Sequence, residues 1–429
     1  MSKSRPYSSI AVKQVQTEAY KGRAGQGCWV GIDVAKLELI VVVRWSDGTF
    51  ERPWRVKNPR ELGELVARLG ALGSQGPLTV AMESSGTYGD AARQAFADGG
   101  IALQRVSAKA VKDQAETFDG VPSQHDGKDA AIIADLCARG KGKAWPLRCE
   151  DQAEQEIRYL VRKLDSAQKI KQVWCGKAEG LLARHWPELS SLLKVSGATL
   201  PRALARWASP AALAADAEAA GELAKLGGRF LTAEKIAAVI ESARTTKGVR
   251  MTAWQSRELQ EVAGAIVEQR RVINACVRQL KQVAGGHKVI ARQAPALGFV
   301  VACVLWTCVG DPHDYGCAAA YRKAMGLNLS ERSSGQYKGQ LHISKRGQRL
   351  GRKWLYFSAL RWMKNPAVRR FSDAKKGRDG GKGSRAVVAV MRRLALAAWH
   401  VGQGERFDPG KLFPGKRSAR KARTSAAPS

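Results

Sequence analysis

The sequence predicts an α/β domain followed by two predominantly helical regions. Three observations indicate this fold class. Short apolar runs bounded by turn residues occupy residues 28–148, and long stretches with apolar residues at helical spacing follow from about residue 150. A second series of helical patterns begins near residue 291. The length of 429 residues is that of two or three domains.

The predicted elements of the first region follow a definite order. Apolar or alternating runs predict strands at 29–34, 37–43, 50–56, 78–82 and 102–106, and helical spacing predicts helices at 59–72, 88–97 and 123–139. The resulting order β-β-β-α-β-α-β-α is that of the ribonuclease H type of fold. We expect this domain to span residues 28–148 and to follow a flexible extension over residues 1–27.

The rest of the chain has helical patterns. In a linker region of residues 149–290, two long helices are predicted at 152–182 and 251–283, as candidate coiled-coil arms, with small Ala-rich helices over 200–248 between them. The C-terminal domain, residues 291–405, has predicted helices at 295–309, 316–325, 351–363 and 382–400 and a polar loop at 330–343. The basic tail, residues 406–429, is expected to be disordered.

The charge of the chain predicts a polyanionic partner. The sequence has 71 Lys and Arg against 38 Asp and Glu, a net charge of +33. A fold with this charge repels itself unless an anion binds, and nucleic acid fits because phosphate neutralisation releases counterions. The excess of basic residues is uneven along the chain. Residues 28–148 contain 16 basic and 15 acidic residues, whereas residues 338–385 contain 15 basic and two acidic residues.

Other classes of protein do not fit the composition. No apolar run is long enough to span a membrane, and residues 1–27 contain no apolar secretion signal. The eight cysteines include no C-x-x-C pair, which favours reduced thiols and a cytoplasmic protein. The six scattered histidines show no zinc-binding pattern.

Four carboxylates in the first region are candidate ligands of a catalytic metal. Asp33 lies within a predicted strand, Glu83 follows another, and Asp126 and Asp129 share a face near the start of a helix. Carboxylates buried together need a cation, and Mg²⁺ prefers oxygen ligands and can hold a phosphodiester. Each acid also has a simpler interpretation: a capping box of Ser123 with Asp126, a helix-dipole role for Asp129, and a surface position for Glu83.

A second candidate site lies in the polar segment 330–343 and the basic stretch after it. Ser333 and Ser334 precede Gly335, and a hydroxyl in such a loop is a candidate nucleophile for a phosphate group. The neighbouring cations expected to contact nucleic acid are Arg332, Lys338, Lys345, Arg346, Arg349, Arg352 and Lys353. Phosphate binding without chemistry is the alternative, and Tyr337 is a rival nucleophile.

Several motifs, taken in order, resemble one family of bacterial transposases. They are GIDVAK at 31–36, MESSGTY at 82–88, DGKDA at 126–130, ALG at 296–298 and ISKRG at 343–347. The family is that of the bridge-RNA-guided recombinases, or insertion-sequence family one-ten. The resemblance covers the first and third regions, somewhat over half of the chain, but not residues 200–248 or the N-terminal extension.

The resemblance implies a RuvC-like domain in which Asp33, Glu83, Asp126 and Asp129 bind Mg²⁺, and a serine domain with Ser334, immediately before Gly, as nucleophile. It further implies a phosphoserine–DNA intermediate and a guide RNA that pairs with donor and target DNA. It also implies a homo-oligomer, a dimer or tetramer, in which the two domains meet between subunits. Because the residues before Asp126 depart from the family pattern, Lys128 is expected to supply a phosphate contact.

Three hypotheses about function follow. The first is an RNA-guided transposase that excises and integrates an insertion sequence through Ser334. The second is a hydrolytic RuvC-like nuclease or Holliday-junction resolvase, in which a metal-bound water attacks and the C-terminal domain only binds DNA. The third is a non-catalytic nucleic-acid-binding protein, against which the presence of all four acids argues. The first two differ in whether Ser334 becomes joined to DNA.

Overall fold

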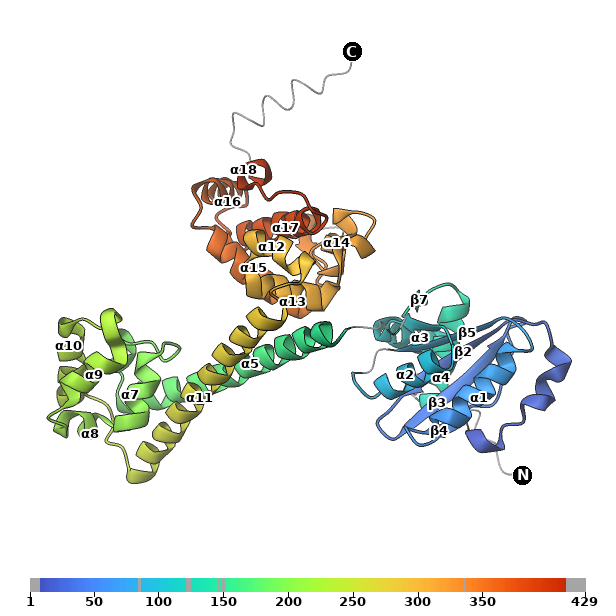
Figure 1. Ribbon diagram of the computed structural model, residues 1–429, viewed down its shortest axis with the longest axis horizontal. Helices are drawn as coiled ribbons and strands as arrows, with labels where there is room; N and C mark the ends of the chain where they lie inside the picture. Colours follow the sequence, from blue (N-terminus) through green and yellow to red (C-terminus); the bar gives the residue numbers. More distant parts are fainter. Residues whose placement is uncertain are drawn as a thin grey trace, which may run out of the picture. The chain divides into compact units, whose positions relative to one another are not determined.

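The computed structural model describes residues 8–83, 86–120, 125–145, 147, 151–334 and 337–413. The chain divides into two compact units, residues 1–149 and 150–429 (Figure 1). The first unit is built around a mixed β-sheet and the second is almost entirely helical. The predicted fold class, an α/β domain followed by all-α regions, is therefore confirmed.

The sheet of the first unit has seven strands in the order β1-β4-β3-β2-β5-β6-β7. Three central strands form an antiparallel meander, and the next two run parallel to the first of them because a helix crosses over before each. The meander strands are β2 (Cys28–Val34), β3 (Glu38–Trp45) and β4 (Trp54–Lys57), and the parallel strands are β5 (Leu78–Glu83) and β6 (Leu103–Val106). The edges are β1 (Ile10–Ala11) and β7 (Lys143–Ala144).

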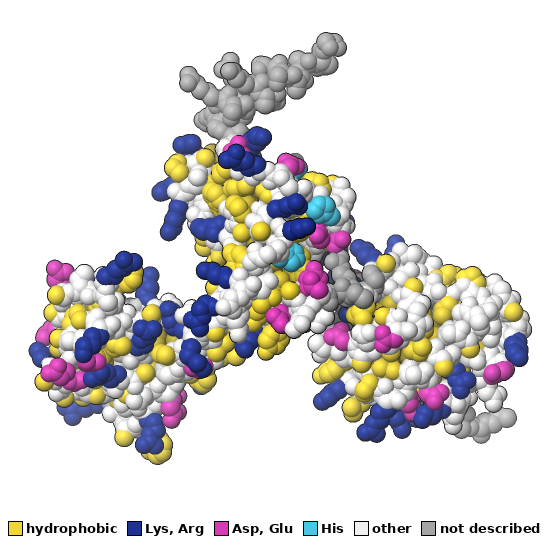
Figure 2. Space-filling view, in the orientation of Figure 1, with side chains coloured by type: hydrophobic (Ala, Val, Ile, Leu, Met, Phe, Trp, Pro, Cys, Tyr) yellow, Lys and Arg dark blue, Asp and Glu magenta, His cyan; other side chains and the backbone are white. Residues whose placement is uncertain are grey.

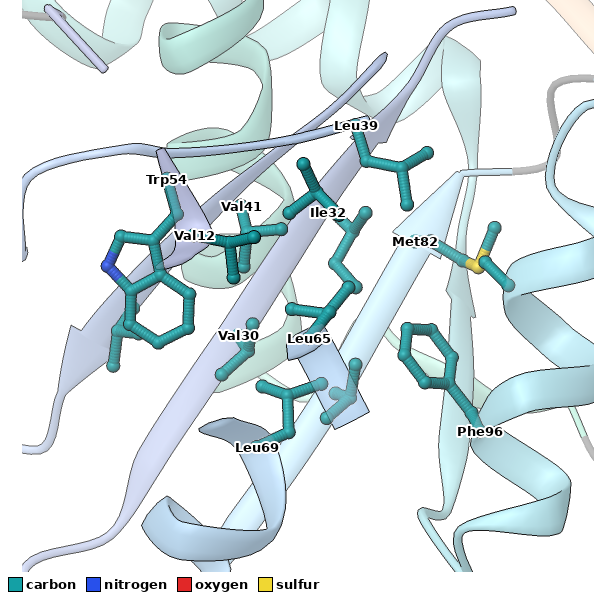
Figure 3. Close-up of a cluster of buried hydrophobic side chains, with 14 of the residues drawn as sticks. Val12, Val30, Ile32, Leu39, Val41, Trp54, Leu65, Leu69, Met82 and Phe96 are labelled. Atoms are coloured by element: carbon teal, nitrogen blue, oxygen red, sulfur yellow. The ribbon is translucent and has the colours of Figure 1, made fainter. Parts of the chain in front are cut away.

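Helices cover both faces of this sheet. On one face, α1 (Leu62–Gly73) and α2 (Asp90–Asp98) bury Leu65, Leu69 and Phe96 against Val30 and Ile32 of β2 (Figure 3). On the other face lie α3 (Ala108–Asp119) and α4 (Asp126–Ala138), and α4 contacts β2, β3 and β5. Because β2 is covered on both sides, its side chains are nearly all buried.

Three features of this unit differ from the prediction. Residues 8–27 are not a flexible extension, because Ile10 pairs with Trp54 and the side chains of Val12 and Val15 belong to the core (Figure 3). The strand predicted at 50–56 is regular only from Trp54. Helix α3 was not predicted, and it buries Val111 and Ala115. Residues 1–7 lie outside the described part of the chain.

The second unit begins with two long helices, α5 (Gln152–His185) and α11 (Ala253–Val283), which correspond to the two predicted arms. They are antiparallel, since Ile157 near the start of α5 packs with Leu280 near the end of α11. At their far end the intervening chain forms small helices around Trp186 and Trp207. These are α6 (Leu189–Leu192), α7 (Thr199–Trp207), α8 (Pro210–Ala215), α9 (Ala219–Gly227) and α10 (Ala233–Thr245).

At the near end of the arms lies a helical body with one hairpin. Its helices are α12 (Lys288–Leu297), α13 (Phe299–Val309), α14 (Ala318–Ala324), α15 (Arg349–Trp362), α16 (Pro366–Arg378), α17 (Gly383–Gly402) and α18 (Pro409–Leu412). Its hairpin consists of β8 (Leu329–Ser334) and β9 (Tyr337–Ile343). Figure 2 shows Lys and Arg side chains along the arms and over this body. Among the described residues, no helix combines the length and apolar character of a membrane span.

Three predictions about this helical body differ from the structure. The helix predicted at 295–309 is divided by Gly298, whose φ of +89° ends α12. The predicted polar loop 330–343 is a hairpin, because Leu329 pairs with Ile343 and the strands continue toward Ser334. The tail is not disordered from residue 406, since Phe413 is 2% exposed in the core of the body. Residues 414–429 lie outside the described part.

Candidate active site

The sheet brings two of the predicted acids to one end of the first unit. Strands β2 and β5 are neighbours and parallel, with Ile32 opposite Met82. Asp33 and Glu83 are the next residues on these two strands. Both carboxylates therefore lie where the two central strands end, at the same edge of the sheet.

Helix α4 adds the other two acids. Asp126 and Asp129 are both in its first turn, and the helix lies close against β2. A Cβ atom at Gly31 would be 2.0 Å from the carbonyl oxygen of Ala130 and 2.4 Å from the backbone nitrogen of Ala134. Only glycine permits this approach, so Gly31 sets the distance between the helix and the strand that carries Asp33.

We expect Gly31→Ala to destabilise the first unit strongly, because the added methyl group must push α4 away from β2. Overpacking typically costs about 1–3 kcal/mol, and the upper end is expected here because the added methyl group meets backbone atoms. Urea denaturation measures the change. Gly70→Ala is the matched control: it lies within α1, where nothing is within 4 Å of the added Cβ. It should be neutral or raise stability by up to ~1 kcal/mol. A Gly31→Ala protein as stable as the wild type would contradict the close packing.

The acids influence one another. Burial, followed by the charges of Asp126, Asp129 and Glu83, raises the pKa of Asp33 to about 7. Burial and then Asp129 raise the pKa of Glu83. Burial and then Asp126 raise the pKa of Asp129, while Lys128 and His125 act in the opposite direction. The four carboxylates therefore share one electrostatic environment, and a nearby cation would relieve their repulsion.

The donor chemistry fits a hard divalent cation. All four side chains offer carboxylate oxygens, which are the ligands of Mg²⁺. Among the described residues, however, no group of three or more His, Cys, Asp or Glu has the spacing that would hold a metal ion. The capping-box interpretation of Asp126 does not fit, because His125 is the N-cap of α4 and Ser123 lies outside the described residues.

Lys128 does not have the role predicted for it. Its side chain is 0% exposed, and its Nζ lies 2.6 Å from Oδ1 of Asp119. A buried ammonium in an ion pair is not available to a phosphate of bound DNA, because burial excludes the ligand and Asp119 already offsets the charge. The local sequence pattern could not reveal this, since the burial of Lys128 results from tertiary packing.

The second predicted site lies at the end of the β8–β9 hairpin. Ser334 is the last residue of β8 and pairs with Tyr337. Gly335 and Gln336 lie outside the described residues, as do the side chains of the nucleophile candidates Ser333, Ser334 and Tyr337 and of the cations Arg332 and Lys338. The backbone of Ser334 thus lies at the end of the paired part of the hairpin.

Among the cations after the hairpin, Lys345, Arg346 and Arg349 are exposed and remain candidates for phosphate contact. Two others are occupied within the protein. Arg352 donates to the carbonyl oxygens of Met325 and Gly347 at 2.9 and 3.0 Å. Lys353 lies 2.9 Å from Asp165 of α5, and this ion pair connects the body to the arm. Their geometry favours a structural role over the predicted nucleic-acid contact.

Two family models match the chain. A model of the DEDD transposases of IS110 matches residues 30–187, and a model of the IS116/IS110/IS902 transposase family matches residues 289–373. Together they cover more than half of the chain. The chain belongs to the IS110 family of transposases. It is accordingly a DNA transposase, and residues 188–288 of this IS110-family enzyme lie between the two matched parts.

Individual relatives agree with this assignment. The transposase is 26% identical over 336 residues to the insertion element IS110 43.6 kDa protein of Streptomyces coelicolor, covering 76% of this chain and 77% of that protein. It is 23% identical over 378 residues to the transposase of IS1111A from Coxiella burnetii, covering 86% and 88%. A solved structure, T. thermophilus RuvC with a Holliday junction substrate, is 19% identical with a TM-score of 0.22 and covers 28% of this chain and 99% of that one.

Proposed function

We propose that this transposase excises and integrates an insertion sequence through a serine nucleophile, with Mg²⁺ at the acid cluster and a guide RNA that pairs with donor and target DNA. The observation that supports it best is the convergence of four carboxylates from β2, β5 and α4 at one edge of the sheet. The position of Ser334 at the end of a hairpin followed by exposed cations supports the choice of nucleophile.

In this proposal each site has a separate task. The Oγ of Ser334 attacks a DNA phosphodiester, a Ser–O–P bond forms, and one P–O bond of the strand breaks to leave a free hydroxyl on the other strand end. The energy of the broken bond is kept for strand exchange. Asp33, Glu83, Asp126 and Asp129 would hold Mg²⁺, which when bound offsets the charge that develops on the phosphate. Lys345, Arg346 and Arg349 would attract the DNA backbone.

The proposal extends to the assembly. The RuvC-like domain of one subunit would meet the serine domain of another, as the family resemblance implies. The long antiparallel helices α5 and α11 are suited to hold two subunits together. Cross-linking followed by mass measurement would show whether the particle is a dimer or a tetramer.

A denaturing gel tests the chemistry. Purified transposase with its co-purified RNA is incubated with Mg²⁺ and labelled DNA that contains the ends of the element. A protein–DNA adduct that survives denaturation supports the serine mechanism. Cut DNA without an adduct favours the hydrolytic nuclease, and intact DNA bound tightly favours the non-catalytic protein. Ribonuclease treatment before the reaction should abolish the choice of target if RNA guides it.

The cations after the hairpin lead to a binding prediction. Lys345→Ala and Arg346→Ala should each weaken binding to all DNA sequences alike and reduce the slope of log K against log salt by about 1, because each removes one phosphate contact. Fluorescence anisotropy over a salt series measures the slope. Lys225→Ala, which removes an exposed cation paired with Glu222 in α9, is the control. A loss confined to one DNA sequence would contradict the role of these residues in backbone contact.

A further inference from the structure

The second unit contains a cationic cavity next to the hairpin of Ser334. Its volume is about 560 Å³, and it lies between the β8–β9 hairpin, α16 and the N-terminal half of α17. Five of the residues that line it are basic: Lys345, Lys375, Lys382, Arg385 and Arg392. Four of them, all except Lys345, are not among the cations that the sequence predicted to contact nucleic acid. Only the fold brings them beside the hairpin.

Most of this charge is not compensated by the protein. Asp379 is the single acid among the described lining residues, and its carboxylate is 2.9 Å from Nζ of Lys375. Arg392 donates from Nε to the backbone oxygen of Leu327 at 3.0 Å and has no acidic partner among the described residues. Within the described part of the chain, Lys382 and Arg385 form no ion pair either. Such a group of cations repels itself, and a bound anion would reduce this repulsion.

The start of α17 adds to the positive potential. This helix has 20 residues, and its N-cap, Lys382, provides no capping side chain. Its first turn contains Arg385 and no acid, although the positive end of a helix dipole favours acidic residues. The unpaired backbone N–H groups at a helix start are donors for a bound anion. The residues at the start of α17 therefore destabilise the free protein and favour the binding of an anion.

A strained residue lies on the opposite wall. Lys345 has a φ of +55°, in the left-handed region that residues other than glycine rarely adopt. Its N–H donates to the carbonyl oxygen of Gly326 at 3.0 Å, and the N–H of Ser344 donates to Asn328 at 2.7 Å. These bonds hold the strained conformation and keep the Lys345 side chain at the cavity. Strain of this kind is characteristic of ligand sites.

The cavity lies close to the predicted nucleophile along the hairpin. Gly339 lines it and is two residues along β9 from Tyr337, the partner of Ser334. At about 3.3 Å per residue, this separation along the strand is ~7 Å. Phosphates of one B-form strand follow each other every ~3.4 Å along the helix axis, and roughly twice that far apart along the strand itself. The cavity therefore begins one or two phosphates from the level of Ser334, according to the direction in which the strand crosses the hairpin.

We propose that this cavity binds backbone phosphates of the DNA strand that Ser334 attacks, one or two nucleotides from the reacting phosphodiester. The proposal rests on the function proposed above. Lys382 and Arg385 are its positioning residues: they hold the strand in register with the nucleophile and do not take part in the chemistry. Because phosphates carry no sequence information, the cavity acts alike on every DNA sequence.

The test is a binding experiment with neutral linkages in the DNA. Full-length transposase with its co-purified RNA binds labelled element-end DNA in which one phosphate at a time, within four of the cleavage site, is a methylphosphonate. The wild type should lose about 10-fold in affinity at one or two linkages, within two of the cleavage site. In the double variant Lys382→Gln, Arg385→Gln the same linkages should cost less than threefold, because the contact is already absent. Arg385→Lys, which keeps the charge, should retain most of the wild-type profile.

A matched pair of variants controls for loss of charge. Arg369 and Arg370 are exposed on α16 and do not line the cavity. Arg369→Gln, Arg370→Gln should keep the wild-type methylphosphonate profile. The melting temperature of Lys382→Gln, Arg385→Gln should be equal to that of the wild type or higher, because two cations leave the positive end of α17. A purely structural role of the two residues would lower it.

The outcomes separate this proposal from the serine mechanism, since binding requires no chemistry. A missing adduct with the wild type would overturn the serine mechanism but would not contradict phosphate binding in the cavity. A flat methylphosphonate profile in the wild type, or an unchanged profile in the double variant, would overturn the cavity proposal. Interference that depends on neutral linkages in the RNA, and not in the DNA, would also overturn it.

Discussion

Ser334→Ala abolishes the covalent protein–DNA product and strand exchange, whereas Ser333→Ala retains both. This is the result we expect if the serine immediately before Gly335 is the nucleophile, because alanine has no oxygen to form the Ser–O–P bond. The rate should fall by about 10⁴-fold or more, as when a nucleophile is removed from other enzymes that use covalent catalysis. Ser333→Ala is the matched control, since it makes the same change one residue earlier in β8.

The measurement is the yield of adduct on a denaturing gel, with binding of the same DNA measured in parallel. Binding should be unchanged in Ser334→Ala, which separates loss of chemistry from loss of substrate. An adduct in Ser334→Ala that disappears in Ser333→Ala would assign the nucleophile to Ser333. An adduct in both variants would make Tyr337 the candidate nucleophile. DNA cleavage without an adduct in any of the proteins would establish the hydrolytic nuclease.

Asp33→Asn is the second variant with a large expected effect, and it should change activity and stability in opposite directions. Cleavage should fall by more than about 10²-fold, because a metal ligand matters at least as much as the groups that orient it. Without metal, however, the variant should be more stable than the wild type. Its neutral amide removes a buried charge that three neighbouring carboxylates repel.

The sign of the pH dependence follows from the raised pKa. The pKa of Asp33 is about 7 in the folded protein, against 3.8 for an ordinary aspartate side chain. As pH rises from about 4 to about 7, the unfolded chain loses this proton first, so the wild type loses stability over this interval. The loss is on the order of 4 kcal/mol, at ~1.4 kcal/mol per pH unit, and is complete above pH 7. The advantage of Asp33→Asn is therefore absent at pH 4 and greatest above pH 7.

Urea denaturation in EDTA at several pH values measures this difference, and added Mg²⁺ should reduce it by stabilising the wild type. Asp47→Asn is the control within the same unit. Hydrogen bonds from Thr49 lower the pKa of the exposed Asp47, so that its loss should not stabilise the protein at any pH. An Asp33→Asn variant that is less stable than the wild type at pH 8, or one that cleaves normally, would contradict the acid cluster.

Regular patterns of apolar residues explain which elements could be predicted. Strands β2, β3 and β5 and helices α1 and α4 contain many buried apolar residues, so they are visible in the sequence. Helix α3 buries only Val111 and Ala115, and the hairpin at 329–343 is largely polar, so neither contains an apolar run. The N-terminal segment has only a few core residues, such as Val12. They become part of the core only through contacts with Trp54 and other residues distant in the sequence.

Residue types and local spacing were enough to find the family motifs and to predict the four acids and Ser334 as site residues. Which charged groups remain available to a ligand could be seen only in the folded chain. Asp33 and Glu83 meet because β2 and β5 are neighbours, and Gly31 lets α4 bring Asp126 and Asp129 to them. Burial removes Lys128 from the predicted phosphate contacts, and packing of α17 beside the hairpin adds Lys382 and Arg385. The reason is that long-range packing, and not local spacing, sets both the distance between charges and their exposure to a ligand.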